Sequence, residues 1–159
     1  MSDLRPRAFP TIVFGGLAAA LGDGLFAVIF YGVIRGIKQL RIFQGVASGL
    51  LGRQAFSGGV ATYLLGVLLH FVIAACIAAV YYLLGRKWPV LTKRPIVFGL
   101  VFGVLAYLVM NYVVIPVSAA RHGPFHLSNF IIEMVSHAFL VGLPIALIAR
   151  ASAAPARPY

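Results

Sequence analysis

The sequence predicts an all-α polytopic membrane protein, a four-transmembrane-helix bundle with an interfacial amphipathic helix between spans 1 and 2. Three observations predict this class. Hydrophobic residues make up 62% of the 159 residues and charged residues only 10%, against roughly 25% charged in a soluble domain. The apolar residues gather in four runs that are long enough to cross a bilayer, which takes roughly 20 residues per helix. The basic residues lie between and beside these runs, where Lys and Arg anchor a chain to lipid headgroups.

We expect a single transmembrane domain over residues 1–150, followed by a disordered tail over 151–159 with two prolines. The four spans are expected at 11–34, 59–84, 95–117 and 129–148. Pro95 suits the first position of a helix, and the Gly99/Gly103 pair permits close approach of a neighbouring helix.

The segment between spans 1 and 2 has a different pattern. An uncharged run of 11 residues, IFQGVASGLLG, is too short to span a bilayer. Apolar residues recur there at helical spacing, whereas Lys38, Arg41 and Ser48 fall largely on the other side, as in a helix that lies in the membrane interface. A pore loop or lid is the alternative. The apolar positions are Ile37, Leu40, Phe43, Ala47 and Leu51, and the interfacial basic residues are Arg35, Lys38, Arg41 and Arg53.

The distribution of Lys and Arg predicts the topology. The termini and the loop between spans 2 and 3 share one side and carry eight of the 13 basic residues, against five on the other side. The positive-inside rule therefore predicts cytoplasmic termini, with His122 and His126 in the periplasm. The net charge of +10 does not indicate a nucleic-acid partner, because no soluble domain remains to carry one. The expected partners are the lipid bilayer and, for so small a set of spans, further copies or a larger membrane complex.

Every span contains a strongly polar residue at a similar depth. At 1.5 Å per helical residue, these residues lie roughly 18 to 24 Å from the cytoplasmic ends of the spans. An aspartate in the middle of a span costs about 2.5 to 3.5 kcal/mol on insertion scales, so a partner inside the bundle is expected. We therefore predict a polar layer that faces a common interior or an oligomer interface. Its members are Asp23, His70, Asn111, Glu133 and His137.

Three functions remain open for this polar layer. Intramembrane ionisable groups bind or relay a proton, an ion or a small polar solute, and this is the leading expectation. The layer is alternatively a set of hydrogen bonds that fixes helix packing in a structural or accessory subunit. A haem b held by His70 and His137 from facing helices is the third reading, although no other cofactor signature accompanies it.

Known catalytic motifs do not match this sequence, so we expect a protein that is not an enzyme. Glu133 and His137 are four residues apart and share a helix face, but they do not form the HExxH zinc motif. A single intramembrane aspartate cannot form an aspartyl dyad. A metal-assisted reaction that uses Asp23, Glu133 and both intramembrane histidines is the catalytic alternative.

The stretches LRIFQGVASGLLG, LVMNYVVIPVSA and VGLPIALIAR resemble a family of small, uncharacterised four-span bacterial inner-membrane proteins. The resemblance covers most of the chain, from about Phe14 to Arg150. It implies four helices and a location in the bacterial plasma membrane. It implies no activity and no catalytic residues.

Overall fold

Four long helices account for most of the chain. The computed structural model describes residues 4–120, 123 and 125–155. Its long helices are Pro10–Ile34, Gly59–Lys87, Pro95–Val117 and Leu127–Ala151, and each is long and apolar enough to cross a membrane. The prediction of an all-α chain with four such helices is therefore confirmed. The predicted ends differ from the observed ones by at most three residues, at the ends of the second and fourth helices.

Three of the four helices contain π-helical turns, which are rare and occur frequently at functional sites. The second long helix is α3, Gly59–Lys87, and is α-helical throughout. The first consists of π turns over Pro10–Gly15, α1 over Gly16–Ala27 and π turns over Val28–Ile34. The third consists of α5 over Pro95–Val109, π turns over Met110–Val114 and α6 over Ile115–Val117. The fourth consists of α7 over Leu127–Ser136, π turns over His137–Gly142 and α8 over Leu143–Ala151.

The shorter elements connect the long helices. α2, Gln39–Leu51, and a 3₁₀ segment, Gly52–Ser57, join the first helix to α3. α4, Val90–Lys93, joins α3 to α5. Two short strands, β1 (Leu4–Arg5) and β2 (Ala154–Pro155), pair antiparallel. α8 ends at Ala151 and the chain continues into β2, whereas residues 156–159 lie outside the described part of the chain, so the disordered tail over 151–159 stays a prediction.

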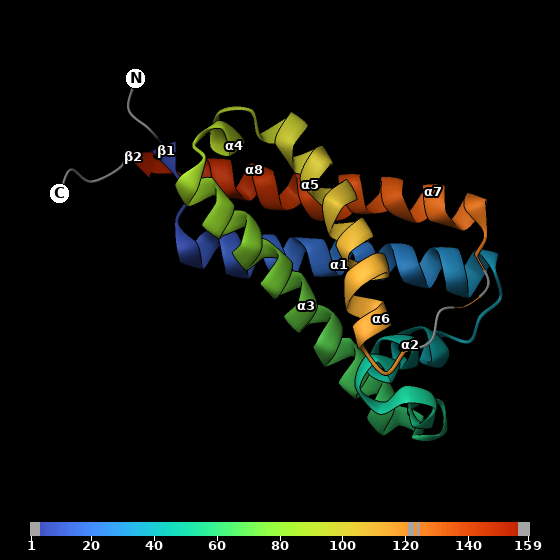
Figure 1. The fold of residues 1–159 in the computed structure, drawn as a ribbon. Coiled ribbons are helices and arrows are strands. Elements are labelled where there is room, and N and C mark those ends of the chain that lie inside the picture. The colour runs from blue at the N-terminus through green and yellow to red at the C-terminus, as the bar shows by residue number, and fades with distance from the viewer. Residues whose placement is uncertain (1–3, 121–122, 124, 156–159) are drawn as a thin grey trace.

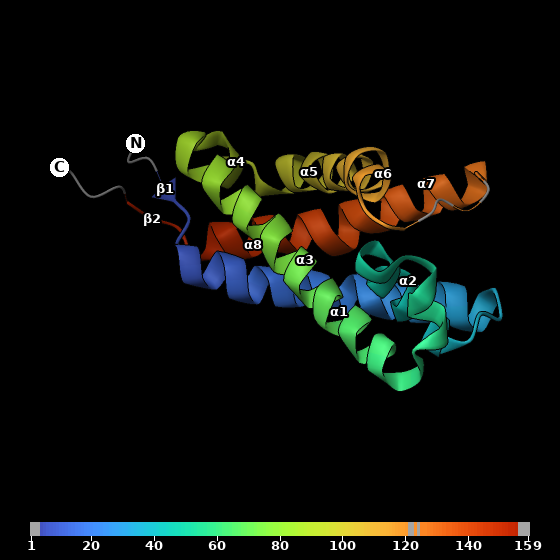
Figure 2. The same cartoon turned by 60° about the horizontal axis from the view of Figure 1, so that its bottom comes forward.

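The long helices surround a central space: α1 and α7–α8 form its floor, and α3 and α5–α6 form its two walls. α1 and α7–α8 lie side by side and antiparallel, while α3 and α5–α6 run at an angle to them (Figure 1); Figure 2 shows α3 crossing α1 from a second side. α3 packs on α1, and α5 packs on α8 and on the π turns that precede it. α2 lies against the start of α3, and a bond from Ala119 N to Gly49 O of 2.9 Å ties it to the segment after α6. The walls therefore meet near α2, at the end away from the termini.

The buried face of α2 differs from the one that its sequence predicts. Phe43 and Ala47 are buried as expected, but Gln44 and Ser48 are buried beside them, and Ser48 was expected on the polar side. Gln44 Nε2 donates to Gly59 O at 3.0 Å and to Thr62 Oγ1 at 3.2 Å, which supplies partners that a sequence pattern does not show. The predicted helix is confirmed for this segment. Its position in the membrane interface stays a prediction.

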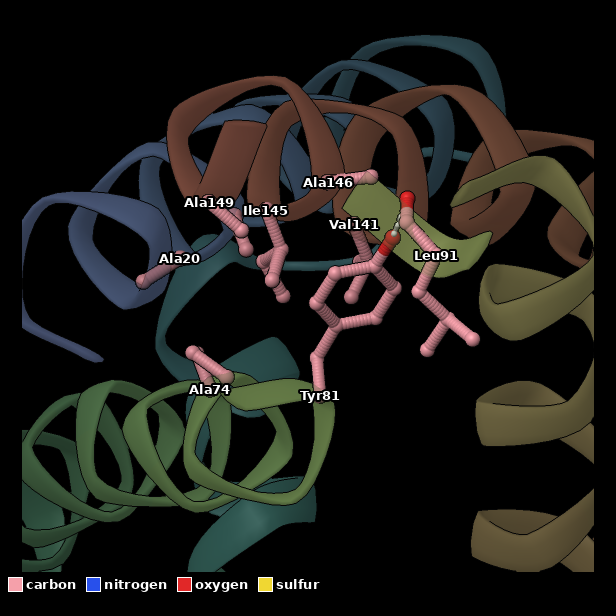
Figure 3. Close-up of a cluster of buried hydrophobic side chains, with 10 residues drawn as sticks. Ala20, Ala74, Tyr81, Leu91, Val141, Ile145, Ala146 and Ala149 are labelled. Carbon is pink, nitrogen blue, oxygen red and sulfur yellow. Dashed lines mark hydrogen bonds between the residues drawn. The ribbon is translucent and has the colours of Figure 1, made fainter. Parts of the chain in front are cut away.

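The densest packing lies at the end that carries the termini. Small side chains on α1, α3 and α8 surround Ile145 and Tyr81, and the Tyr81 hydroxyl donates to Leu91 O at 3.2 Å (Figure 3). The predicted close approach at Gly99 and Gly103 is present. A Cβ added at Gly103 would lie 2.3 Å from His137 O, and one at Gly99 would lie 2.7 Å from the Ala146 Cβ. Glycine is needed here because the backbones themselves are in contact.

The outer faces of the long helices remain apolar. Leu25 is 62% exposed, Leu64 58% and Ile96 58%. Exposed apolar surface on this scale indicates contact with lipid or with another protein surface. Both termini and α4 lie at one end of the bundle, as the predicted topology requires (Figure 1). Which end faces the cytoplasm stays a prediction, and His122 lies outside the described residues.

Candidate functional site

The floor and the two walls enclose a cleft of about 600 Å³. All five members of the predicted polar layer line it, and they come from all four long helices. The cleft extends from Ala19 and Val141, in the middle of the bundle, to Ile37, Ser118 and Gly123 at the end that carries α2. The common interior that the matching depths predict is therefore this cleft. Its polar members are Asp23, His70, Asn111, Glu133 and His137.

Asp23 and His137 form one of the contacts between the first and last helices. Asp23 Oδ1 lies 3.6 Å from His137 Nδ1, and each side chain is 20% exposed. The same Nδ1 lies 3.0 Å from Glu133 O, one turn earlier on the fourth helix. Because a carbonyl oxygen only accepts, Nδ1 carries the hydrogen and donates to Glu133 O. The bond to Glu133 O fixes the orientation of the His137 ring, with Nδ1 on the side of Asp23.

Glu133 has different partners from those that its spacing suggests. Its carboxylate accepts from the hydroxyl of Tyr31 and, at 3.1 Å, from the hydroxyl of Tyr107. Glu133 and His137 share a face, but the bond between them uses the Glu133 backbone and not its side chain. Two hydroxyl donors satisfy this carboxylate, which joins three of the four long helices.

His70 contacts the first helix and not another member of the polar layer. Its Nε2 lies 2.9 Å from Ala20 O, and its ring meets those of Phe43 and Phe71 edge-on. A Cβ added at Gly24 would lie 3.3 Å from the same Nε2, so the small residue beside Asp23 makes room for this ring. None of these contacts joins His70 to Asp23, Asn111, Glu133 or His137.

Asn111 bonds within its own helix. Its Nδ2 donates to Tyr107 O at 3.1 Å, one turn earlier. This leaves Oδ1 without a protein donor in the described residues. Asn111 thus presents an acceptor to a cleft that it lines together with Tyr107.

The four interfacial basic residues take three different positions. Arg35 donates to Asn129 Oδ1 and lies over the Phe30 ring, 5.4 Å from its centroid. Arg41 is exposed and lines the cleft, whereas Lys38 and Arg53 are exposed and do not line it. All four belong to the end that carries α2. A lipid-headgroup role stays a prediction for them.

Tyr31 and Tyr107 are site residues that the sequence analysis missed. Both line the cleft and both bond to Glu133. One signal was present in the spacing: Tyr107 precedes Asn111 by four residues and therefore shares its face. Tyr31 gave a weaker signal, because it follows Asp23 by eight residues and lies in π turns that change the helical register.

The contacts of the two histidines use one nitrogen of each ring. His70 Nε2 and His137 Nδ1 each lie within hydrogen-bond distance of a backbone carbonyl, which leaves His70 Nδ1 and His137 Nε2 as the nitrogens with a lone pair in the neutral rings. A haem held by His70 and His137 stays a prediction. Among the described residues, no group of three or more His, Cys, Asp or Glu side chains is placed to hold a metal ion.

Comparison with protein-family models, curated proteins and solved structures finds no match for this chain.

Proposed function

We propose that this chain is a bacterial inner-membrane protein, with both termini in the cytoplasm, whose intramembrane cleft binds a small polar solute without transforming it. The observation that carries the proposal is the shared cleft: five polar residues from four helices line one space of about 600 Å³. A bare proton or a single ion needs no such volume, whereas small-molecule sites are typically about 300 to 1,000 Å³.

The chemistry of the lining supports the same proposal. Apolar side chains make up most of the walls, including Ile73, Ile77 and Met110, and a few polar groups converge between them. This combination is typical of ligand sites, in which apolar contact supplies affinity and polar groups fix orientation. Asp23 and His137 line the cleft from the first and fourth helices, 3.6 Å apart.

A solute site must be accessible from water, whereas a polar layer that only packs the helices together would exclude water. We suggest a single cysteine at Ala27, a lining residue, in a Cys76→Ser background, with 2-hydroxyethyl methanethiosulfonate as the probe. Thiolates react with this reagent only where water reaches them, so Ala27→Cys should be modified in membranes. The matched control is Leu25→Cys, two residues away and exposed on the outer face, which should stay unmodified in lipid. If Ala27→Cys also stays unmodified, the cleft is not a solute site.

A structural role is the second candidate, and one observation favours it. Glu133 accepts from Tyr31 and Tyr107 and so connects three helices without needing a ligand. In that case the polar layer would serve helix packing in an accessory subunit. The cysteine experiment separates the two candidates, because a packing layer would exclude the reagent from Ala27.

A further inference from the structure

We infer that the solute of the cleft carries an organic ammonium group, and that Asp23 is the residue that binds it. This inference rests on the proposed function, that the cleft binds a solute. It adds the charge of the ligand and the atoms that recognise it. The argument follows from which hydrogen-bonding groups of the cleft already have protein partners.

The hydroxyl groups that line the cleft already donate hydrogen bonds to protein acceptors. Those of Tyr31 and Tyr107 donate to Glu133. Those of Ser48 and Ser118 donate to backbone carbonyls of their own segments, at 2.6 and 2.8 Å. A ligand that needs hydrogen-bond donors from these groups would have to break existing bonds.

The two histidines present acceptors. His70 Nε2 faces Ala20 O and His137 Nδ1 faces Glu133 O, so each of these nitrogens carries a hydrogen. In the neutral ring the other nitrogen, Nδ1 of His70 and Nε2 of His137, is then an acceptor. Together with Oδ1 of Asn111, these atoms favour a ligand that donates hydrogen bonds.

Asp23 supplies the charge. Within the described residues, the ion-pair contact of its carboxylate is with His137 Nδ1 at 3.6 Å, and the hydrogen of that nitrogen is directed to Glu133 O at 3.0 Å. Glu133, by contrast, has two hydroxyl donors. A carboxylate at this depth is costly without a counter-charge. An ammonium group beside Asp23 would supply both the charge and the missing donors.

An organic cation suits the surroundings better than a metal ion. The described residues offer no cluster of three metal-binding side chains, and the walls beside Asp23 are apolar, with Ala19, Ala27 and Ile73 among them. Tyr31 and Tyr107 also line the space, and tyrosine rings attract ammonium groups. The apolar walls would contact the hydrocarbon part of the ligand.

Arg41 is the opposing charge and gives the inference a sharp test. It lines the cleft from α2, where it is exposed. With neutral histidines, the lining carries two carboxylates and this one guanidinium, which leaves a net negative charge. Removing the Arg41 charge should strengthen binding of a cation and weaken binding of an anion.

The experiment uses three probes of matched shape and different charge: n-hexylammonium, n-hexanol and n-hexanoate. Each is titrated by calorimetry into the full chain in dodecyl maltoside, a detergent without an ammonium group. Hexylammonium should bind saturably and at least about tenfold more tightly than the other two. Asp23→Asn, which keeps the size of the side chain, should reduce hexylammonium binding by about tenfold or more. Arg41→Gln, on the exposed side of α2, should increase it.

Repeating the titration in nanodiscs of phosphatidylethanolamine identifies the source of the ammonium group. Hexylammonium binding that persists there indicates a free amine as the ligand. Binding that is lost there and recovered in detergent indicates a lipid headgroup in the cleft.

Two results would overturn the inference, and they differ in what they imply for the proposed function. If hexanol or hexanoate binds as tightly as hexylammonium, or if Asp23→Asn leaves hexylammonium binding unchanged, the ammonium assignment is wrong while the cleft still binds a solute. If none of the probes binds, the ammonium assignment is also wrong, and modification of Ala27→Cys decides independently whether the cleft admits solutes.

Discussion

Asp23 and His137 approach within 3.6 Å across the boundary between the first and last helices, although 114 positions separate them in the chain. Each is 20% exposed, and the exposed part of each faces the cleft that both line. The pair lies close enough for attraction when the imidazole is protonated, and too far apart for a short hydrogen bond.

The Asp23–His137 contact should be measurable as a coupling free energy. A double-mutant cycle with Asp23→Asn and His137→Gln should give about 0.5 to 1 kcal/mol, because each single mutant already removes the contact between the two side chains. The measurement is unfolding in mixed micelles of dodecyl maltoside and SDS. Asp23→Asn combined with Cys76→Ser serves as the control pair. A coupling free energy no larger than that of the control pair would contradict an energetic contact between Asp23 and His137.

The tyrosines that donate to Glu133 should contribute to stability. Tyr31→Phe and Tyr107→Phe each remove one donor from a carboxylate, which typically costs about 1.5 to 3 kcal/mol. Tyr112→Phe is the matched control, because Tyr112 is 63% exposed and should cost little. The same unfolding assay reports all three. A Tyr31 effect as small as that of Tyr112 would show that Glu133 is satisfied from elsewhere.

Close helix contact at Gly103 predicts a strong effect of a single methyl group. In Gly103→Ala the new Cβ would lie 2.3 Å from His137 O, so backbone must move. Overpacking of this kind costs about 1 to 3 kcal/mol. Gly45→Ala is the control, since a Cβ there meets nothing within 4 Å and alanine favours the helix. Gly103→Ala should unfold at a lower SDS fraction than wild type, and Gly45→Ala should not.

The predicted topology is testable with two single cysteines in the Cys76→Ser background. Ser57→Cys lies at the end that carries α2, and Lys87→Cys lies at the end that carries the termini. A membrane-impermeant maleimide should label Ser57→Cys in spheroplasts, and Lys87→Cys only after lysis. The opposite labelling pattern would place both termini in the periplasm.

Hydropathy and the depth of residues in the spans predicted the helices and the shared cleft, whereas the hydrogen-bond partners of individual side chains could not be predicted. The four spans follow from hydropathy, because a bilayer-length apolar run has few alternatives. The five polar residues of similar depth line one cleft, and their role as a binding site stays a prediction. Depth alone carries no information on rotation about the helix axis, so it could not show that His70 would bond to a backbone carbonyl.

Residue types that occur both on exposed and on buried surfaces, such as tyrosine and serine, were the hardest to place. Tyrosine occurs at membrane interfaces as well as in polar sites, so Tyr31 and Tyr107 gave no clear signal before Glu133 was placed between them. Ser48 was assigned to the wrong face of α2 because a hydroxyl can be buried when it bonds to its own helix, here to Gly45 O at 2.6 Å.

The two ends of the bundle are held together by different kinds of contact. At the end with the termini, β1 pairs with β2 and the glycine contacts bring backbones together, so no side chain can yield. At the other end, the α2–α3 wall meets the opposite wall near the Ala119–Gly49 backbone bond. A small hinge rotation about the end that carries the termini would separate α2 from the segment after α6. This rotation would widen the approach to Asp23 and leave the β1–β2 pair and the glycine contacts in place.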